Sequence, residues 1–147
     1  MTRLSLEVVT AQRLVYAGEV DAVQAQGVRG QLGILPHHTP LLTLLQPGEL
    51  VARRGETETR FAVTGGFLEV FQDQVTVFAD AAERAEEIDL DRAEEARRKA
   101  QDLLLRKIDV LEFARAEAAL RRSLARIKVA RWRRAGRTTP PKLPSTH

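Results

Sequence analysis

The first 80 or so residues alternate apolar and polar positions, a pattern typical of half-buried β-strands. Leu4, Leu6 and Val8, for example, alternate with Ser5 and Glu7. The same period predicts further strands at 12–17, 20–26, 48–54, 59–64, 67–71 and 74–79. Short strands about ten residues apart favour an antiparallel sandwich or barrel.

Glycine and polar pairs divide these strands. Gly55 predicts one hairpin turn and Asp73-Gln74 another, while Gly65-Gly66 predicts a tight turn or a bulge. The stretch 27–38, GVRGQLGILPHH, holds three glycines and one proline, and we expect a loop there with a short apolar insertion. Two roles stay open for that insertion: it caps one end of the sandwich, or it is an exposed docking loop.

Beyond Glu83 the apolar period changes from two to three or four, which predicts helix. One apolar stripe runs through Leu90, Ala93, Arg97, Ala100, Leu104 and Ile108, and a second through Phe113, Ala116, Leu120, Leu124 and Ile127. Asp109 followed by Glu112 has the form of a capping box. We therefore expect two helices, 90–106 and 110–134, folded as a hairpin.

One continuous helix through 90–134 is the alternative. The chain has no glycine or proline from Phe67 to Ala135, and an aspartate inside a helix costs at most ~0.7 kcal/mol relative to alanine. The predicted fold class is thus α+β, with a β-sandwich over 1–84 and a helical hairpin over 85–135. Residues 136–147, rich in proline, serine and threonine, are expected to form a disordered tail.

The charge is divided unevenly between the two parts. Residues 1–82 hold six arginines and nine acids, for a net −3, and residues 83–147 hold 17 basic and 11 acidic residues, for a net +6. A basic arm indicates an anionic partner, such as a protein surface, a nucleotide, a nucleic acid or lipid headgroups. The simpler alternative is a solvated helix face followed by a charged tail.

The composition also excludes some classes of protein. There is no cysteine, so neither a disulfide framework nor a thiolate metal site is available, and a reducing compartment fits. No run approaches the ~20 apolar residues of a membrane-spanning helix. The N-terminus alternates like a strand and lacks the apolar core of a signal peptide. We expect a soluble or peripheral protein of bacterial-cytoplasmic character.

Four segments, in this order, resemble the epsilon-subunit family of F-type ATP synthases. They are GQLGILPHHTPLL (30–42), VTGGFLEVFQDQVTV (63–77), ADAAERAEEIDLDRA (79–93) and RAEAALRRSLARI (115–127). The likeness covers about residues 3–134, although Trp132 and about the last dozen residues fall outside the family pattern. It implies a ten-stranded β-sandwich followed by an antiparallel two-helix hairpin.

The resemblance also implies a function and partners. The protein would be a non-catalytic rotor subunit, coupling proton flow to ATP synthesis from the cytoplasmic face of the bacterial membrane. Its sandwich would bind the gamma subunit and the c-subunit ring, and its hairpin would extend toward the catalytic alpha and beta subunits to inhibit ATP hydrolysis. The predicted contacts with the ring and gamma are Arg29, Gln31, His37 and His38. The predicted contacts of the extended arm with beta are Arg115, Arg121, Arg122 and Arg126.

A regulatory ATP site is implied by a shorter motif. Ile88-Asp89-x-x-Arg92-Ala93 matches the I/L-D-x-x-R-A sequence of ATP-binding members of the family. Matching positions elsewhere hold Glu83, Lys99, Arg122 and Arg126. Position 99 is arginine in those members, so Lys99 offers a point charge in place of a fork. The alternative is that Asp89 and Arg92 form only an i,i+3 ion pair, worth ~0.2–0.5 kcal/mol.

Other chemistry finds little support in the sequence. GVRGQLG lacks the lysine of a phosphate-binding loop, and no catalytic triad or carboxylate pair is indicated, so no enzyme and no required cofactor are expected. His37 and His38 are adjacent on a predicted loop, where their side chains diverge, and we expect no metal site. A stand-alone adapter or nucleic-acid-binding module with a basic arm is the competing function, although only Trp132 offers a stacking surface among the arginines.

Overall fold

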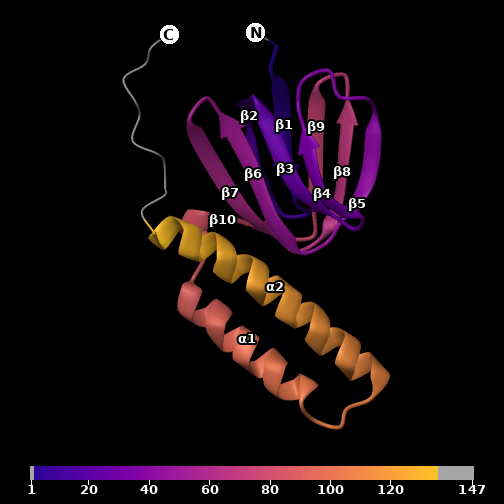
Figure 1. The fold of residues 1–147 in the computed structure, drawn as a ribbon, viewed down its shortest axis with the longest axis vertical. Helices are drawn as coiled ribbons and strands as arrows, with labels where there is room; N and C mark the ends of the chain where they lie inside the picture. Colours follow the sequence, from indigo (N-terminus) through magenta and orange to yellow (C-terminus); the bar gives the residue numbers. More distant parts are fainter. Residues whose placement is uncertain (1, 136–147) are drawn as a thin grey trace.

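The computed structural model describes residues 2–135 and places ten strands ahead of two long helices (Figure 1). The strands are β1 (Leu4–Val9), β2 (Leu14–Val20), β3 (Ala22–Gly27), β4 (Gly30–Ile34), β5 (Leu41–Leu45), β6 (Gly48–Arg54), β7 (Thr57–Val63), β8 (Gly66–Phe71), β9 (Gln74–Ala79) and β10 (Ala82–Arg84). The short helix η1 (Ala85–Glu87) leads to α1 (Leu90–Leu104) and α2 (Val110–Arg134).

One hydrogen-bonded sheet folds over itself to make the sandwich. Its strand order is β10-β7-β6-β3-β5-β8-β9-β1-β2, with β4 paired to β3. The passage from one layer to the other runs through β3 and β5, which share a single residue pair, Gly27 with Leu45. Every strand pair is antiparallel except β1 with β9, which is parallel, so the expectation of a purely antiparallel sandwich is wrong at this one place.

The core lies between the two layers and is aliphatic. Its largest fully buried side chains include Leu4, Leu6, Ile34, Leu50 and Phe61. Leu6 and Val8 alternate with half-exposed or exposed neighbours, as the two-residue period predicted. The predicted β-sandwich followed by a two-helix hairpin is confirmed.

The pattern missed three of the ten strands. The predicted loop 27–38 contains β4, which forms a hairpin with β3 through a two-residue turn at Val28-Arg29. Glycines at 30 and 33 hide the alternation of this strand, because they add no side chain to either face. Strand β5 was missed since four of its five residues are leucine, and β10 is only three residues long.

The sequence predicted the positions of the turns more accurately than those of the strands. Gly55 has a φ of 60° and joins β6 to β7, which confirms the predicted hairpin. The β8–β9 turn lies at Gln72 and Asp73, both with positive φ, one residue before the predicted position. Gly65 and Gly66 adopt φ values of 133° and 123°, a region that favours glycine.

The two helices form the predicted hairpin below the sandwich, with α2 nearer to the sheet (Figure 1). Helix α1 ends at Leu104, two residues before the predicted end, and α2 has the predicted bounds. The side chain of Asp109 accepts the Glu112 backbone N–H at 2.7 Å, which is the forward half of the predicted capping box. This cap stops one long helix from forming in the folded arrangement.

The second predicted stripe is wrong in part. Phe113 and Leu124 are about half exposed, whereas Ala116, Ile127 and Val129 are buried. The reason is that α2 packs on two partners, α1 on one side and β6, β7 and η1 on another. Its buried positions therefore follow two faces and not one stripe. The predicted disordered tail lies outside the described residues.

Candidate functional site

The contact between the hairpin and the sandwich is the candidate functional site, because most predicted regulatory residues lie near it. Its apolar centre is small. Ala62 of β7, Ala85 of η1 and Val129 of α2 are buried together, and Ile88 and Trp132 pack against them half-buried. Two alanines and one valine bury little apolar surface, so the helix contact depends also on polar groups.

Two ion pairs join α2 to the sandwich. Nε of Arg126 lies 2.7 Å from Oε1 of Glu83 in β10, and Nη2 of Arg126 donates a hydrogen bond to Oε2 of Glu83 at 3.3 Å. The Nε contact is an ion-pair contact only, since this buried nitrogen has no hydrogen-bond acceptor. Nζ of Lys128 lies 3.9 Å from Oε1 of Glu49, with most of the lysine side chain in solvent.

Trp132 covers a second charged group on the sandwich. The guanidinium of Arg60 lies over its indole ring, 4.6 Å from the ring centroid. Arg60 is itself held by two carboxylates at 2.8 Å each, Glu49 through Nη1 and Glu58 through Nη2. Arg53 binds the other oxygen of Glu58 at 2.7 Å. The cation under the indole ring is therefore fixed from both sides.

This network moves two pKa values in opposite directions. Burial favours the neutral form of Glu58, but hydrogen bonds from Arg53 and Arg60 outweigh burial and lower the pKa of the Glu58 carboxyl. Burial likewise disfavours the charged form of Arg60, yet hydrogen bonds to Glu58 and Glu49 raise its pKa above the ordinary arginine value. Glu58 and Arg60 are thus both charged at neutral pH.

The connection between the domains is also anchored to the sandwich. The Glu87 carboxylate accepts the backbone N–H of Arg84 and a hydrogen bond from Arg13 of the β1–β2 connection. Those bonds, the backbone one first, lower the pKa of Glu87. Arg84 in turn donates to the carbonyl of Val15 and lies over the ring of Tyr16. The extended residues Ile88 and Asp89, which we call the pivot, join the anchored η1 to the start of α1.

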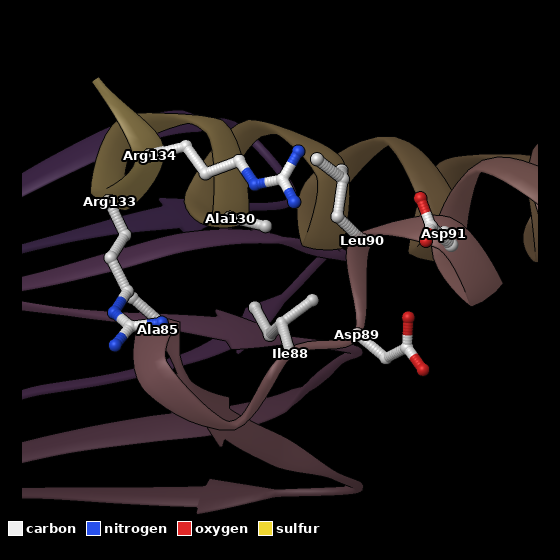
Figure 2. Close-up of a pocket in the computed structure, with 8 residues that line it drawn as sticks. All are labelled: Ala85, Ile88, Asp89, Leu90, Asp91, Ala130, Arg133 and Arg134. Atoms are coloured by element: carbon white, nitrogen blue, oxygen red, sulfur yellow. The ribbon is translucent and has the colours of Figure 1, made fainter.

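A pocket of about 240 Å³ opens at this pivot, between the start of α1 and the end of α2. Figure 2 shows the guanidinium groups of Arg133 and Arg134 toward one side, the carboxylates of Asp89 and Asp91 on the other, and Ile88 and Leu90 between them. Within residues 2–135 neither guanidinium forms an ion pair. The lining is mostly polar, and the side of the pocket formed by the two guanidinium groups is suited to an anionic group of a ligand.

The structure brings together some of the predicted ATP residues. Ile88 and Asp89 line the pocket, whereas Glu83 and Arg126 pair with each other and are not part of its lining. Asp89 is the N-cap of α1 and accepts the backbone N–H of Arg92 at 3.2 Å, so the alternative side-chain ion pair between these two residues does not form. Ala93 is fully buried beneath them.

Lys99 and Arg122 remain apart from that group. Lys99 pairs with Glu95 on its own helix and is largely exposed, and Arg122 is exposed on α2. The pattern missed Arg133 and Arg134, which lie C-terminal to the segments resembling the family. The signal that could have found them is the antiparallel hairpin itself, which brings the end of α2 to the start of α1.

The residues predicted to contact the c ring, gamma and beta lie in several separate parts of the structure. Arg29 and Gln31 lie at the β3–β4 turn, exposed. His37 and His38 follow the opposite end of β4, where the His37 backbone N–H donates to Asp73 at 2.6 Å. Among the predicted beta-subunit contacts, Arg115, Arg121 and Arg122 are exposed. Arg126 is half-buried and forms an ion pair with Glu83.

A further surface was not predicted from the sequence. The outer apolar face of strands β5, β8 and β9 exposes five large side chains on one side of the sheet: Leu42, Leu44, Phe67, Phe71 and Phe78. Phe67 and Phe78 stack with centroids 4.8 Å apart. The signal was present, because LLTLL and FLEVF place apolar residues on both faces of their strands. An exposed apolar patch on a sheet indicates a protein partner.

Two further observations concern metal binding and membrane-spanning helices. Across residues 2–135, no three His, Cys, Asp or Glu side chains are grouped closely enough to hold a metal ion. Neither helix in the described part of the chain has the length and apolar content needed to cross a membrane.

Sequence families match nearly the whole described chain. The beta-sandwich domain of the ATP synthase delta/epsilon chain matches residues 3–85, and the long alpha-helix domain of the same chain matches residues 86–131. Among curated relatives, the ATP synthase epsilon chain of Dehalococcoides mccartyi is 51% identical over 135 residues, which cover 91% of this chain and 96% of the relative. That of Herpetosiphon aurantiacus is 50% identical over 131 residues, covering 89% and 96%.

Solved structures share the fold at low identity. A chain in the Euglena gracilis mitochondrial ATP synthase structure of OSCP, F1 and c-ring aligns with a TM-score of 0.77 and 22% identity, over 87% of this chain and 81% of that one. A chain in the central stalk and c-ring structure from Tetrahymena thermophila aligns with a TM-score of 0.64 and 17% identity, over 88% and 97%. These likenesses support the arrangement of sandwich and hairpin.

Proposed function

Because this chain belongs to the ATP synthase delta/epsilon chain family, we propose that it is a non-catalytic subunit of the central stalk whose helical hairpin is a movable regulatory arm. The observation that carries the proposal is the small, largely polar contact between hairpin and sandwich. The contact has two alanines and a valine at its buried centre, the half-buried Ile88 and Trp132 beside them, and partly exposed ion pairs around them, and it is small enough to open.

The sandwich supplies the fixed part of the function. Its outer apolar face would bind the gamma subunit, since a patch of leucine and phenylalanine needs cover from a protein surface. The c ring would meet the polar and basic residues around β4, with Arg29 and Gln31 at one end and His37 and His38 at the other. The subunit would then lie at the cytoplasmic face of the bacterial membrane without entering it.

The hairpin supplies the variable part. In the extended state, Arg115, Arg121, Arg122 and Arg126 of α2 would meet acidic groups of the catalytic beta subunits and hinder ATP hydrolysis. Arg126 would then have exchanged Glu83 for a partner on another chain. A two-state arm of this kind responds to a ligand only through the difference in the ligand's affinity for the two states.

ATP is the ligand that we propose for the folded state. The lining of the pocket at the pivot is mostly polar. The guanidinium groups of Arg133 and Arg134 would bind the phosphates, on the side away from the carboxylates of Asp89 and Asp91, and Ile88 and Leu90 would contact the base. Because the pocket draws on both helices, ATP bound there would stabilise the hairpin over the extended arm. Nothing in its lining provides for hydrolysis, and ATP would act as a regulator only.

Truncation tests the arm directly. The cut belongs after Ile88, because β10 and η1 complete the sandwich. A chain ending at Ile88 should still assemble with gamma and the c ring, and the ATPase rate of the assembled enzyme should rise severalfold. An assembled enzyme whose ATPase rate is the same with the full and the truncated chain would reject the regulatory role.

The competing adapter or nucleic-acid function has less support. Helix α2 carries two aromatic side chains, Phe113 near its start and Trp132 near its end. The ring of Trp132, which lies among the arginines of the last turn, is already covered by Arg60. Co-purification separates the two classes, since a stalk subunit should be recovered with gamma and an adapter should not.

A further inference from the structure

We propose that Trp132 is a latch that holds the helical hairpin on the sandwich through the contact of its indole ring with the Arg60 guanidinium. The latch consists of Trp132, Arg60 and the two carboxylates that fix Arg60, Glu49 and Glu58. The inference rests on the proposed function for its regulatory meaning, and its structural content can be tested separately.

The first argument concerns what else holds α2. The buried apolar cluster at the contact contains only Ala62, Ala85 and Val129. Lys128 is 71% exposed and 3.9 Å from its partner, so solvent screens this pair and it contributes little. The Arg126 pair is less exposed, but its Nε has no hydrogen-bond acceptor. Trp132 is the largest side chain that α2 places on the sandwich.

The second argument concerns preorganisation. Arg60 would normally lose side-chain freedom on forming a cation–π contact, and that loss would offset much of the gain. Here Glu49 and Glu58 bind two of its nitrogens at 2.8 Å, and Arg53 fixes Glu58 in turn. These four residues all belong to β6 and β7, so the cation keeps its orientation whether α2 is docked or not.

The third argument concerns position. Trp132 lies in the last turn of α2, near the pivot at Ile88 and Asp89, and it packs against the same apolar cluster as Ile88. Rotation of the hairpin about that pivot must therefore withdraw the indole ring from Arg60. A contact at the pivot therefore determines how often the arm opens. It does not cover the arginines of α2 that the extended arm would present to beta.

Thiol labelling of the full chain can measure how often the contact opens. The chain has no cysteine, and Val129 is fully buried at the contact, so a Val129→Cys variant carries one thiol that reacts only when α2 leaves the sandwich. A Val75→Cys variant in the sandwich core reports global unfolding in the same way. The ratio of labelling rates between latch variants then gives the change in the open population.

In the Val129→Cys background, we expect Trp132→Leu and Arg60→Met each to raise the labelling rate severalfold. If Trp132 and Arg60 contact each other directly, the two substitutions together should raise the labelling rate by less than the product of their separate fold-increases. The shortfall should be about two- to fivefold, which corresponds to the free energy of an exposed cation–π interaction. Trp132→Phe, which keeps an aromatic face, should restore part of the protection. Labelling in the Val75→Cys background should stay unchanged for Trp132→Leu. Arg60→Met also removes the ion pairs with Glu49 and Glu58, so its labelling in the Val75→Cys background measures the loss of global stability, which is subtracted from its effect on the contact.

The control is Arg54→Met, which removes an exposed arginine from the end of the same strand, β6, that carries Glu49. It should leave the labelling rate of the Val129→Cys variant unaltered. The latch would be overturned if the labelling rate of the double variant rose by the full product of the two single fold-increases. It would also be overturned if Trp132→Leu did not raise the labelling rate. If the latch variants open the contact but the ATPase rate of the assembled enzyme does not change, the regulatory function fails and the latch stands.

Discussion

Arg126 of α2 and Glu83 of β10 form an ion pair at 2.7 Å across 43 residues of sequence. Both side chains belong to the predicted ATP site, yet in this structure each is the partner of the other. An ATP phosphate that binds Arg126 must therefore share this guanidinium with Glu83 or displace it. If ATP binds there as proposed, the pair would link ATP binding to the contact between hairpin and sandwich.

From this relationship we predict that Arg126→Ala lowers the ATP affinity of the isolated protein by about tenfold, the value of a charge-assisted hydrogen bond to phosphate. Arg92→Ala, at the start of α1, should lower it as well. Isothermal titration provides the measurement. Arg121→Ala is the matched control, because Arg121 is exposed on the same helix and pairs only with Glu117. Equal ATP affinity in all four proteins would remove Arg92 and Arg126 from the site.

The outer apolar face leads to a prediction about assembly. Leu44 is 61% exposed and lies opposite Phe67 on β8, so Leu44→Glu places a charge in the centre of the face without disturbing the core. We expect gamma to be lost from co-purification while the thermal unfolding midpoint stays the same. Leu14→Glu, on exposed β2, should leave the recovery of gamma intact. Retention of gamma by Leu44→Glu would place the gamma contact elsewhere on the sandwich.

Sequence reasoning succeeded where one periodic pattern meets one partner. Leu4, Leu6 and Val8 bury a single face, so period two was sufficient to predict β1. The periodic pattern failed to predict burial where one segment packs against two different elements. Helix α2 packs on α1 and on the sheet, and therefore Phe113 and Leu124 are exposed against expectation.

The candidate site was only partly accessible from the sequence for a similar reason. Motif matching found Ile88 and Asp89, which are close in sequence and line the pocket. Arg133 and Arg134 reach the same pocket through the antiparallel return of the chain, and Arg60 meets Trp132 through the docking of α2 on β7. Such pairs depend on tertiary geometry, which local periodicity does not contain.

The carboxylates at the contact predict a dependence on pH. The pKa values of Glu58 and Glu87 are lowered in the folded protein, by hydrogen bonds from arginines at Glu58 and first by the Arg84 backbone N–H at Glu87. A lowered folded pKa adds stability that is complete above the ordinary glutamate value of 4.5 and is lost as the pH falls through the folded value. Acidification should thus destabilise the folded protein.

Denaturant unfolding at pH about 7 and about 3 would measure this loss. Glu58→Gln should be less stable than wild type at the higher pH and should lose less stability on acidification, because the titrating group is gone. Glu19→Gln, at an exposed glutamate of β2, provides a comparison for general charge effects. A wild-type protein and a Glu58→Gln variant that lose equal stability would exclude Glu58 as a source of the acid sensitivity.

Gly66 leads to a prediction about the sandwich itself. It begins β8 beside the end of β9, with a φ of 123°, and a Cβ at this position would lie 2.0 Å from the carbonyl oxygen of Phe78. Neither backbone can move away without breaking the pairing of β8 with β9. Gly66→Ala should therefore cost at least about 3 kcal/mol in the free energy of unfolding, through strain and through the displaced strand.

Gly33→Ala is the control for this substitution. Gly33 is also a strand glycine, but no heavy atom lies within 4 Å of its added Cβ, so the change should stay within about 0.5 kcal/mol. Urea denaturation of both variants measures the difference. Because Phe67 follows Gly66 and stacks on Phe78, a displaced β8 would also distort the outer apolar face, and Gly66→Ala should weaken gamma binding. A Gly66→Ala protein as stable as Gly33→Ala would mean that the β8–β9 junction does not require this close backbone approach.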